Sequence, residues 1–227
     1  MRLTTRDQRL VRDLALSHVL SRDQIIKLGH FSSVTRTNAR LLVLRRLDFV
    51  RRIETPFFAQ SLYMAGPMAA QITGERIALL LKDRADSPRF LQHALTVTNV
   101  RLALLAKGAD SWTFEQQLRR SFTHQGRAFE VRPDGLVLTT KGPLAIEVDL
   151  GHASLPKLAQ KLAAFDLFLR SGECEVQWGF TQFNLLITTT GSLRCRHIER
   201  LIPKGLTQRC AVQTLADLGA DLVGGWS

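Results

Sequence analysis

Residues 33–54 read SVTRTNARLLVLRRLDFVRRIE, and this stretch decides the fold of the N-terminal third of the chain. Small or apolar side chains recur along it at helical spacing, at Val34, Thr37, Leu41 and Leu44. This spacing predicts a helix that Ser32 or Ser33 caps, that ends near Leu47 and that turns the four side chains toward a core.

Two shorter helices are expected before this stretch. An apolar stripe predicts the first of them over residues 5–18. Ser21 and Gln24 have the S-x-x-Q spacing of a capping box, which opens a second helix, and Gly29 is placed to end it. The chain therefore begins with three successive helices.

A β-hairpin is expected directly after the third helix. Residues 49–54 and 57–64 are rich in apolar and β-forming side chains, and a Thr-Pro turn separates them. Asp48 precedes the first strand at a helix end that requires a left-handed backbone, which Asp tolerates. Three helices followed by such a hairpin predict a winged helix-turn-helix domain over residues 1–73.

The basic charge of the chain is concentrated in the same segment. The 227 residues carry 31 Lys and Arg against 20 Asp and Glu, a formal net charge of +11. Residues 1–66 alone hold 12 basic and 5 acidic side chains, which gives 12 − 5 = +7 of that total. We therefore expect a polyanionic partner for this segment, with double-stranded DNA as the leading candidate.

The third helix and the hairpin supply the expected DNA-binding residues. The first half of such a helix faces base edges, which makes Ser33, Thr35, Arg36 and Arg40 the candidates for sequence readout, Arg36 foremost. Arginines at the helix end and at the start of the hairpin are expected to contact phosphates, namely Arg45, Arg46, Arg51 and Arg52. The alternative is a solvated basic face. No cofactor is required for this binding.

Residues 74–110 are expected to form a helical bridge, in which Pro88 begins a long helix. Its apolar positions follow steps of four and three residues, at Leu91, Leu95, Thr98, Leu102 and Leu105. Two readings of this spacing stay open, a helix buried in the core and a short coiled-coil seam between two copies of the chain. The core helix is favoured because two heptads are too few to establish a coiled coil.

Residues 111–227 predict an α/β domain, because strands and helices alternate along them. The expected elements are a helix over 114–122, strands over 128–138 and 144–150 joined by a turn at 141–142, a helix over 154–169, a strand over 183–189, a helix over 192–201 and a strand near 210–212.

The chain resembles the replication-relaxation family, whose members are encoded largely on plasmids and other mobile elements. The resemblance rests on the N-terminal segment and on short C-terminal motifs, namely Arg132-Pro133-Asp134-Gly135, Ile146-Glu147-Val148-Asp149-Leu150-Gly151 with Lys157 and Lys161 downstream, and Phe183-Asn184-Leu185-Leu186-Ile187-Thr188-Thr189. It implies an α/β (α+β overall) protein with a winged helix followed by a restriction-endonuclease-like region, and work on DNA.

The C-terminal carboxylates resemble the PD-(D/E)XK motif of Mg²⁺-dependent nucleases. Asp134 and Glu147 are the expected metal ligands, and Glu115 precedes them on the expected helix. Asp149 stands where the motif has lysine, so Lys157 or Lys161 would have to supply the missing charge. The alternative is a nuclease-like fold retained as a scaffold, with Asp134 and Asp149 engaged in turns or ion pairs, and this alternative is favoured.

Three functions follow as hypotheses. The leading one is a sequence-specific double-stranded DNA-binding protein, a transcriptional regulator of a mobile element that acts as a homodimer. The second is a Mg²⁺-dependent endonuclease or nickase whose catalytic residues would be Asp134, Glu147, Asp149 and Lys161. The third is a binding module that recruits replication or conjugation proteins. The apolar runs are too short for a membrane span, and we expect a cytoplasmic protein with no membrane partner.

Overall fold

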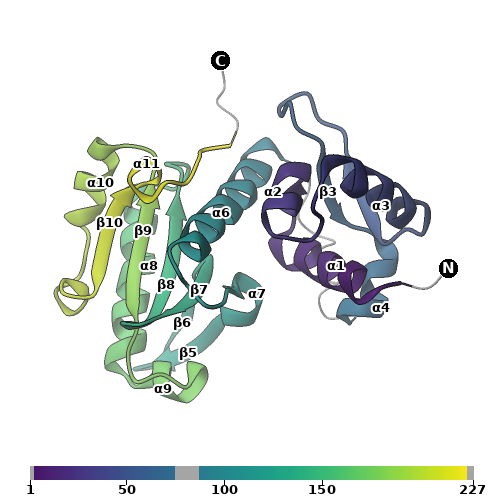
Figure 1. The fold of residues 1–227 in the computed structure, drawn as a ribbon. Coiled ribbons are helices and arrows are strands. Elements are labelled where there is room, and N and C mark those ends of the chain that lie inside the picture. The colour runs from purple at the N-terminus through teal and green to yellow at the C-terminus, as the bar shows by residue number, and fades with distance from the viewer. Residues whose placement is uncertain (1–2, 75–86, 224–227) are drawn as a thin grey trace. The chain divides into compact units, whose positions relative to one another are not determined.

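The computed structural model describes residues 3–74 and 87–223, which form two compact units (Figure 1). The first unit comprises the described residues up to Leu102 together with Leu222 and Val223, and the second runs from Ala103 to Asp221. The chain is a mixed α/β protein. The expected division at residues 73 and 110 stays a prediction. No helix in the described ranges is long and apolar enough to cross a membrane.

Helices and a small antiparallel sheet make up the N-terminal unit. Its elements are α1 (Thr5–Ser17), β1 (Leu20–Ser21), α2 (Arg22–Lys27), α3 (Val34–Arg46), β2 (Val50–Ile53), β3 (Leu62–Ala65), η1 (Pro67–Ala69), α4 (Ala70–Thr73) and α6 (Pro88–Ala106). The last four residues of α6 belong to the second unit. The three helices and the hairpin expected from the sequence are confirmed. So are the helical turns after Pro67 and the long helix that begins at Pro88.

Two capping boxes set where the first helices begin. Thr4 and Asp7 exchange backbone-to-side-chain hydrogen bonds at the start of α1, of 2.7 and 3.2 Å. Ser21 and Gln24 do the same at the start of α2, both at 3.1 Å, as the S-x-x-Q spacing predicts. The Gln24 amide also donates to the carbonyl of Leu95 at 2.8 Å. This bond ties α2 to α6.

The third helix buries three of the four expected side chains. Thr37, Leu41 and Leu44 are at most 1% exposed, whereas Val34 is 46% exposed and its predicted burial is wrong. Val34 is the first residue of α3, and its neighbours Ser33 and Thr35 are exposed as well. The helical spacing is correct, but its first position lies before the part of the helix that packs against the core.

The hairpin is shorter than expected. Strands β2 and β3 pair antiparallel from Val50 opposite Ala65 to Ile53 opposite Leu62. The second strand thus begins at Leu62 and not at Phe57, which is 48% exposed, so residues 54–61 form a loop. Strand β1 pairs with the other edge of β3 and completes a sheet in the order β1-β3-β2.

Asp48 occupies a left-handed position between α3 and β2, with φ of 56°. This confirms the sequence prediction for the helix end. Its carbonyl accepts a hydrogen bond from the Met68 amide at 3.0 Å, and Gly66 passes directly over it. A Cβ on Gly66 would lie 2.2 Å from that carbonyl oxygen, so only glycine fits at this crossing.

Two apolar clusters form the core of the N-terminal unit. One joins α1, α3 and β2, with Leu14, Leu44 and Val50 among its buried members. The other contains Leu91 and Leu95 of α6, both fully buried on the inner side of the small sheet. For these two positions the core-helix reading of the spacing is confirmed, because an internal core covers them.

A five-stranded mixed sheet organises the C-terminal unit, in the order β10-β9-β8-β7-β4. Strands β8, β9 and β10 are parallel, whereas β7 is antiparallel to both β8 and β4. The elements are β4 (Thr113–Phe114), α7 (Glu115–Leu118), β5 (Arg120–His124), β6 (Arg127–Val131), β7 (Gly135–Thr139), β8 (Gly142–Asp149), α8 (Leu155–Arg170), α9 (Glu173–Trp178), β9 (Asn184–Thr189), α10 (Ser192–Glu199), η2 (Lys204–Leu206), β10 (Cys210–Thr214) and α11 (Leu215–Leu218).

Two expected elements of this unit are wrong. The helix expected over residues 114–122 stops at Leu118, and Arg120–His124 is strand β5, because Phe122 is buried between exposed neighbours and pairs with Phe129 on β6. The strand expected over residues 128–138 divides into β6 and β7, which belong to different sheets. Pro133 lies at the break, where it has no amide hydrogen for a sheet ladder.

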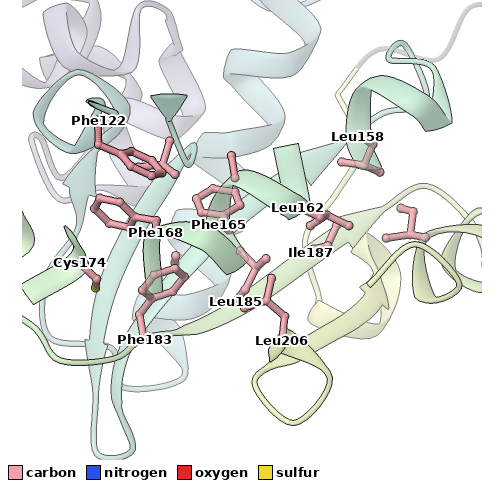
Figure 2. Packing of buried hydrophobic residues seen from close by; sticks show 14 residues of the cluster. Phe122, Leu158, Leu162, Phe165, Phe168, Cys174, Phe183, Leu185, Ile187 and Leu206 are labelled. Carbon is pink, nitrogen blue, oxygen red and sulfur yellow. The ribbon is translucent and has the colours of Figure 1, made fainter. Parts of the chain in front are cut away.

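Helix α8 covers one face of the large sheet. Figure 2 shows the cluster between them, in which Phe165 and Phe168 of α8 lie among residues of the strands and of α9. Leu185 and Ile187 of β9 point into this cluster. Residue 147 of β8 pairs with Ile187, so it lies on the same face of the sheet.

We expect Gly66→Ala to lower the free energy of unfolding by about 1–3 kcal/mol, because the added methyl group collides with backbone. Chemical denaturation followed by circular dichroism measures the change. Gly191→Ala is the matched control, since a Cβ there meets no atom within 4 Å. Equal stability of the two variants would contradict the close approach at Asp48.

Candidate functional site

An arginine-lined hollow lies between the end of α3 and the start of the hairpin. It measures about 430 Å³, and its lining comprises Leu42, Arg45, Arg46, Asp48, Val50, Arg51, Arg52 and Pro67. Four guanidinium groups thus share the hollow with one carboxylate. All four arginines are exposed. Such a concentration of positive charge attracts polyanions.

Arg45, Arg46 and Arg52 have no carboxylate partner among the described residues. The Arg51 guanidinium lies 3.6 Å from the sulfur of Met64. Arg51 and Arg52 are adjacent on a strand, so their side chains leave opposite faces of the hairpin. Their charge is therefore available on both sides of β2.

Arg40 is placed differently from the other arginines of α3. Its Nε and Nη2 atoms donate to the two carboxylate oxygens of Asp7, at 2.7 and 2.5 Å. Asp7 is 1% exposed. Burial raises the pKa of Asp7, but hydrogen bonds from Arg40 and Thr4 outweigh it and leave the pKa below its ordinary value. Arg40 thus ties α3 to α1, and we propose no base contact for it.

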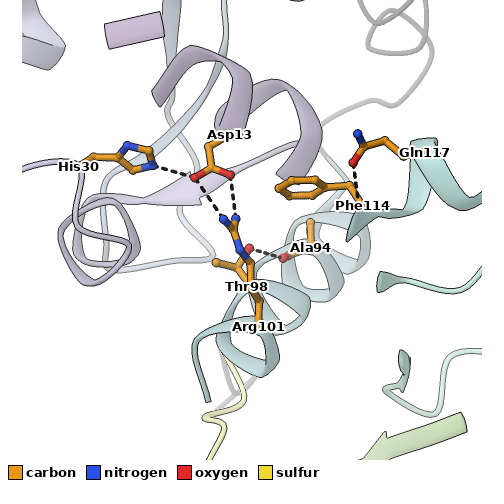
Figure 3. Close-up of polar contacts among 7 residues, drawn as sticks. All are labelled: Asp13, His30, Ala94, Thr98, Arg101, Phe114 and Gln117. Atoms are coloured by element: carbon orange, nitrogen blue, oxygen red, sulfur yellow. Dashed lines mark hydrogen bonds and ion pairs between the residues drawn. The ribbon is translucent and has the colours of Figure 1, made fainter. Parts of the chain in front are cut away.

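A second carboxylate on α1, that of the largely buried Asp13, holds the turn before α3. Figure 3 shows Asp13 between a histidine and an arginine: His30 Nε2 lies 2.7 Å from one oxygen, and Arg101 of α6 donates to the other at 2.7 Å. Burial raises the pKa of Asp13, yet the bonds and charges of His30 and Arg101 lower it further than burial raises it. This network fixes His30, three residues before the cap of α3.

The other expected readout residues lie at the start of α3. Ser33 is the N-cap and accepts a hydrogen bond from the Arg36 amide at 3.3 Å, while Thr35 is exposed. The Arg36 guanidinium donates to the Ser32 hydroxyl at 3.3 Å. The sequence analysis missed Asn38, which is exposed on the same side of the helix. The spacing of four residues between Val34, Asn38 and Leu42 could have revealed this shared side.

The C-terminal unit brings Asp134, Glu147 and Lys161 together. Lys161 of α8 donates to Glu147 Oε1 at 2.5 Å, and Asp134 Oδ2 accepts from the Val148 amide at 2.7 Å. Burial lowers the pKa of Lys161, but the charges of Glu147 and Asp134 outweigh it and raise the pKa above its ordinary value. Of the two lysines considered from the sequence, Lys161 is the one bonded to Glu147.

The two other acidic residues are bound to arginines. Arg194 of α10 donates to both oxygens of Asp149, at 2.7 and 3.1 Å, and also to the carbonyl of Ala153. Arg132 lies 3.0 Å from Glu115. Asp149 is 6% exposed, so its charge is buried and compensated within the fold. It ties β8 to α10.

This arrangement fits a divalent metal poorly. Mg²⁺ prefers several oxygen ligands around an open position, but Glu147 and Asp134 each already accept a strong hydrogen bond, and Asp149 is engaged by Arg194. In the part of the chain that the structure describes, no group of three acidic, histidine or cysteine side chains is arranged to hold a metal ion.

Comparison with known proteins identifies one family whose model matches this chain. The model of the family described as Replication-relaxation matches residues 11–182, more than half of the chain. No curated protein matches. Among solved structures, the crystal structure of protein VC1899 from Vibrio cholerae is 10% identical with a TM-score of 0.35, covering 96% of this chain and 55% of that one. A likeness this distant supports no inference about fold or function.

We expect Asp13→Asn to lower the free energy of unfolding by about 3–5 kcal/mol at neutral pH, because Arg101 and His30 lose a buried partner. Since the folded-state pKa of Asp13 is depressed, its stabilisation is present above the ordinary pKa of 3.8 and is lost as the pH falls through the folded value. Denaturation at neutral and acid pH checks both statements. A difference between variant and wild type that persists in strong acid would contradict the pairing.

Proposed function

Because the chain belongs to the replication-relaxation family, we propose that its N-terminal unit is a winged helix-turn-helix that binds double-stranded DNA. The arginine-lined hollow between α3 and β2 carries this proposal. Its four arginines are exposed to solvent at the end of α3 and on β2, so they are not part of the apolar core of the unit. Phosphates are the ligands that such a surface attracts.

We propose separate roles for the helix and the hairpin in this binding. An α-helix with side chains is roughly 10–12 Å across, which fits the roughly 12 Å width of the major groove. With α3 in the groove, Thr35 and Arg36 of its first turn would lie toward base edges. Arg45, Arg46, Arg51 and Arg52 would then contact the phosphates beside the groove.

We further propose that the protein recognises a specific site and regulates transcription of a mobile element as a homodimer. One helix gives a limited number of base contacts, and two copies on adjacent half-sites multiply a modest affinity. The C-terminal unit would then act as a scaffold for assembly or for contacts with replication or conjugation proteins. The pairing of Asp149 with Arg194, and of Glu115 with Arg132, supports that role.

We expect Arg45→Ala and Arg52→Ala to weaken binding to every duplex by a similar factor and to reduce the slope of log affinity against log salt by about 1 each. Fluorescence anisotropy with unrelated duplexes over a series of salt concentrations measures both quantities. Arg200→Ala, an exposed arginine on the C-terminal unit, is the matched control. Unchanged slopes in the first two variants would refute the proposed surface.

One observation favours a second candidate function. Lys161 contacts Glu147 beside Asp134, which is where a nuclease would need the lysine that Asp149 replaces in this chain. The scaffold reading nevertheless expects supercoiled plasmid to stay intact with Mg²⁺ or Mn²⁺ present. Nicks made by the wild type and abolished by both Glu147→Gln and Lys161→Met would establish the nuclease instead, provided that both variants keep their thermal unfolding transition.

A further inference from the structure

The outward side of α3 is neutral and partly apolar along its middle turns. Val34, Asn38 and Leu42 follow one another at four-residue intervals, and Thr35 and Ala39 lie beside them. All five are exposed, and Val34 and Leu42 are each 46% exposed. Two large apolar side chains are thus nearly half open to solvent on one side of a short helix.

The arginines of α3 lie away from these middle turns. Arg45 and Arg46 are in the last turn, next to the hairpin. Arg40 points back to Asp7, and the Arg36 guanidinium turns to Ser32 one turn earlier. Between the first-turn Arg36 and the last-turn arginines, the exposed side chains on this side of α3 are an amide and aliphatic groups.

This set of side chains matches one kind of base pair. The side-chain amide of asparagine can pair with adenine through two hydrogen bonds: its nitrogen donates to N7, and its oxygen accepts from the N6 amino group. Guanine is recognised chiefly by Arg or Lys. Aliphatic groups contact the C5-methyl of thymine, which G·C pairs lack. The middle of α3 therefore carries side chains that can contact both adenine and thymine.

We infer that α3 reads A·T base pairs at the centre of its half-site, with Asn38 on adenine and Leu42 on a thymine methyl group. This inference rests on the proposed binding of double-stranded DNA and names the base pairs that it selects. The arginines at the end of α3 and on β2 supply affinity without choosing a sequence, because phosphates are the same at every position. Asn38 and Leu42 are thus specificity-determining residues of the site.

A selection from a random duplex library with the full-length protein tests the inference. We expect the wild type to enrich a motif with at least one fixed A·T pair. Asn38→Ala should lose the preference for that adenine by a factor on the order of tenfold, while retaining salt-dependent binding to random duplex. Gln208→Ala, an exposed amide on the C-terminal unit, should enrich the wild-type motif.

Replacement of thymine by uracil isolates the methyl contact, because it removes one methyl group and leaves base pairing unchanged. The wild type should bind the uracil duplex several-fold more weakly than the selected duplex. Leu42→Ala should bind the two duplexes equally. Anisotropy at one salt concentration gives both ratios.

The outcomes separate this inference from the function on which it rests. Enrichment of a motif with only G·C pairs at its centre, or an unchanged motif in Asn38→Ala, would overturn the A·T assignment and leave DNA binding intact. Salt-dependent binding with no enriched motif would likewise overturn it. Absence of binding to any duplex would overturn both proposals.

Discussion

The N-terminal unit depends on the pairing of two carboxylates of α1, one buried and one largely buried. Asp7 and Asp13 lie six residues apart, and a buried charge without a partner is strongly destabilising. Their partners come from distant parts of the sequence: Arg40 lies on α3, and Arg101 lies on α6. Satisfying both acids therefore fixes α3 and α6 against the same helix, and the direction in which α3 presents its open side follows from that.

Buried carboxylates are paired with cationic side chains in the C-terminal unit as well. Glu147 and Asp149 lie on the face of β8 that α8 covers, and each is compensated by a cation from a following helix, Lys161 or Arg194. Both pairs connect the middle of the large sheet to its covering helices. The hollow at α3 differs, because its four arginines are exposed, and Arg45, Arg46 and Arg52 lack acidic partners among the described residues.

Local signals in the sequence were sufficient for much of the N-terminal unit. The capping box at Ser21 and the left-handed backbone at Asp48 depend on interactions within a few residues, and both are confirmed. The strand at Arg120–His124 was missed because its partner strand, and not its own periodicity, decides its structure. For the same reason Arg40 looked like its neighbours on α3: only the fold brings Asp7, 33 residues earlier, against it. Lys161 was named from its position on a helix, but its contact with Glu147 required the packing of α8 on β8.

The loop at residues 54–61 lies outside the ladder that pairs Val50 with Ala65 and Ile53 with Leu62. Its length can therefore vary without shifting the strand register or disturbing the crossing of Gly66 over Asp48, since lengthening a surface loop costs little free energy. In a lineage of related proteins, the reach of the hairpin and the face of α3 would be free to diverge separately. Under the proposed binding of double-stranded DNA, natural variation in the length of the bound site and in its preferred sequence would then be uncorrelated.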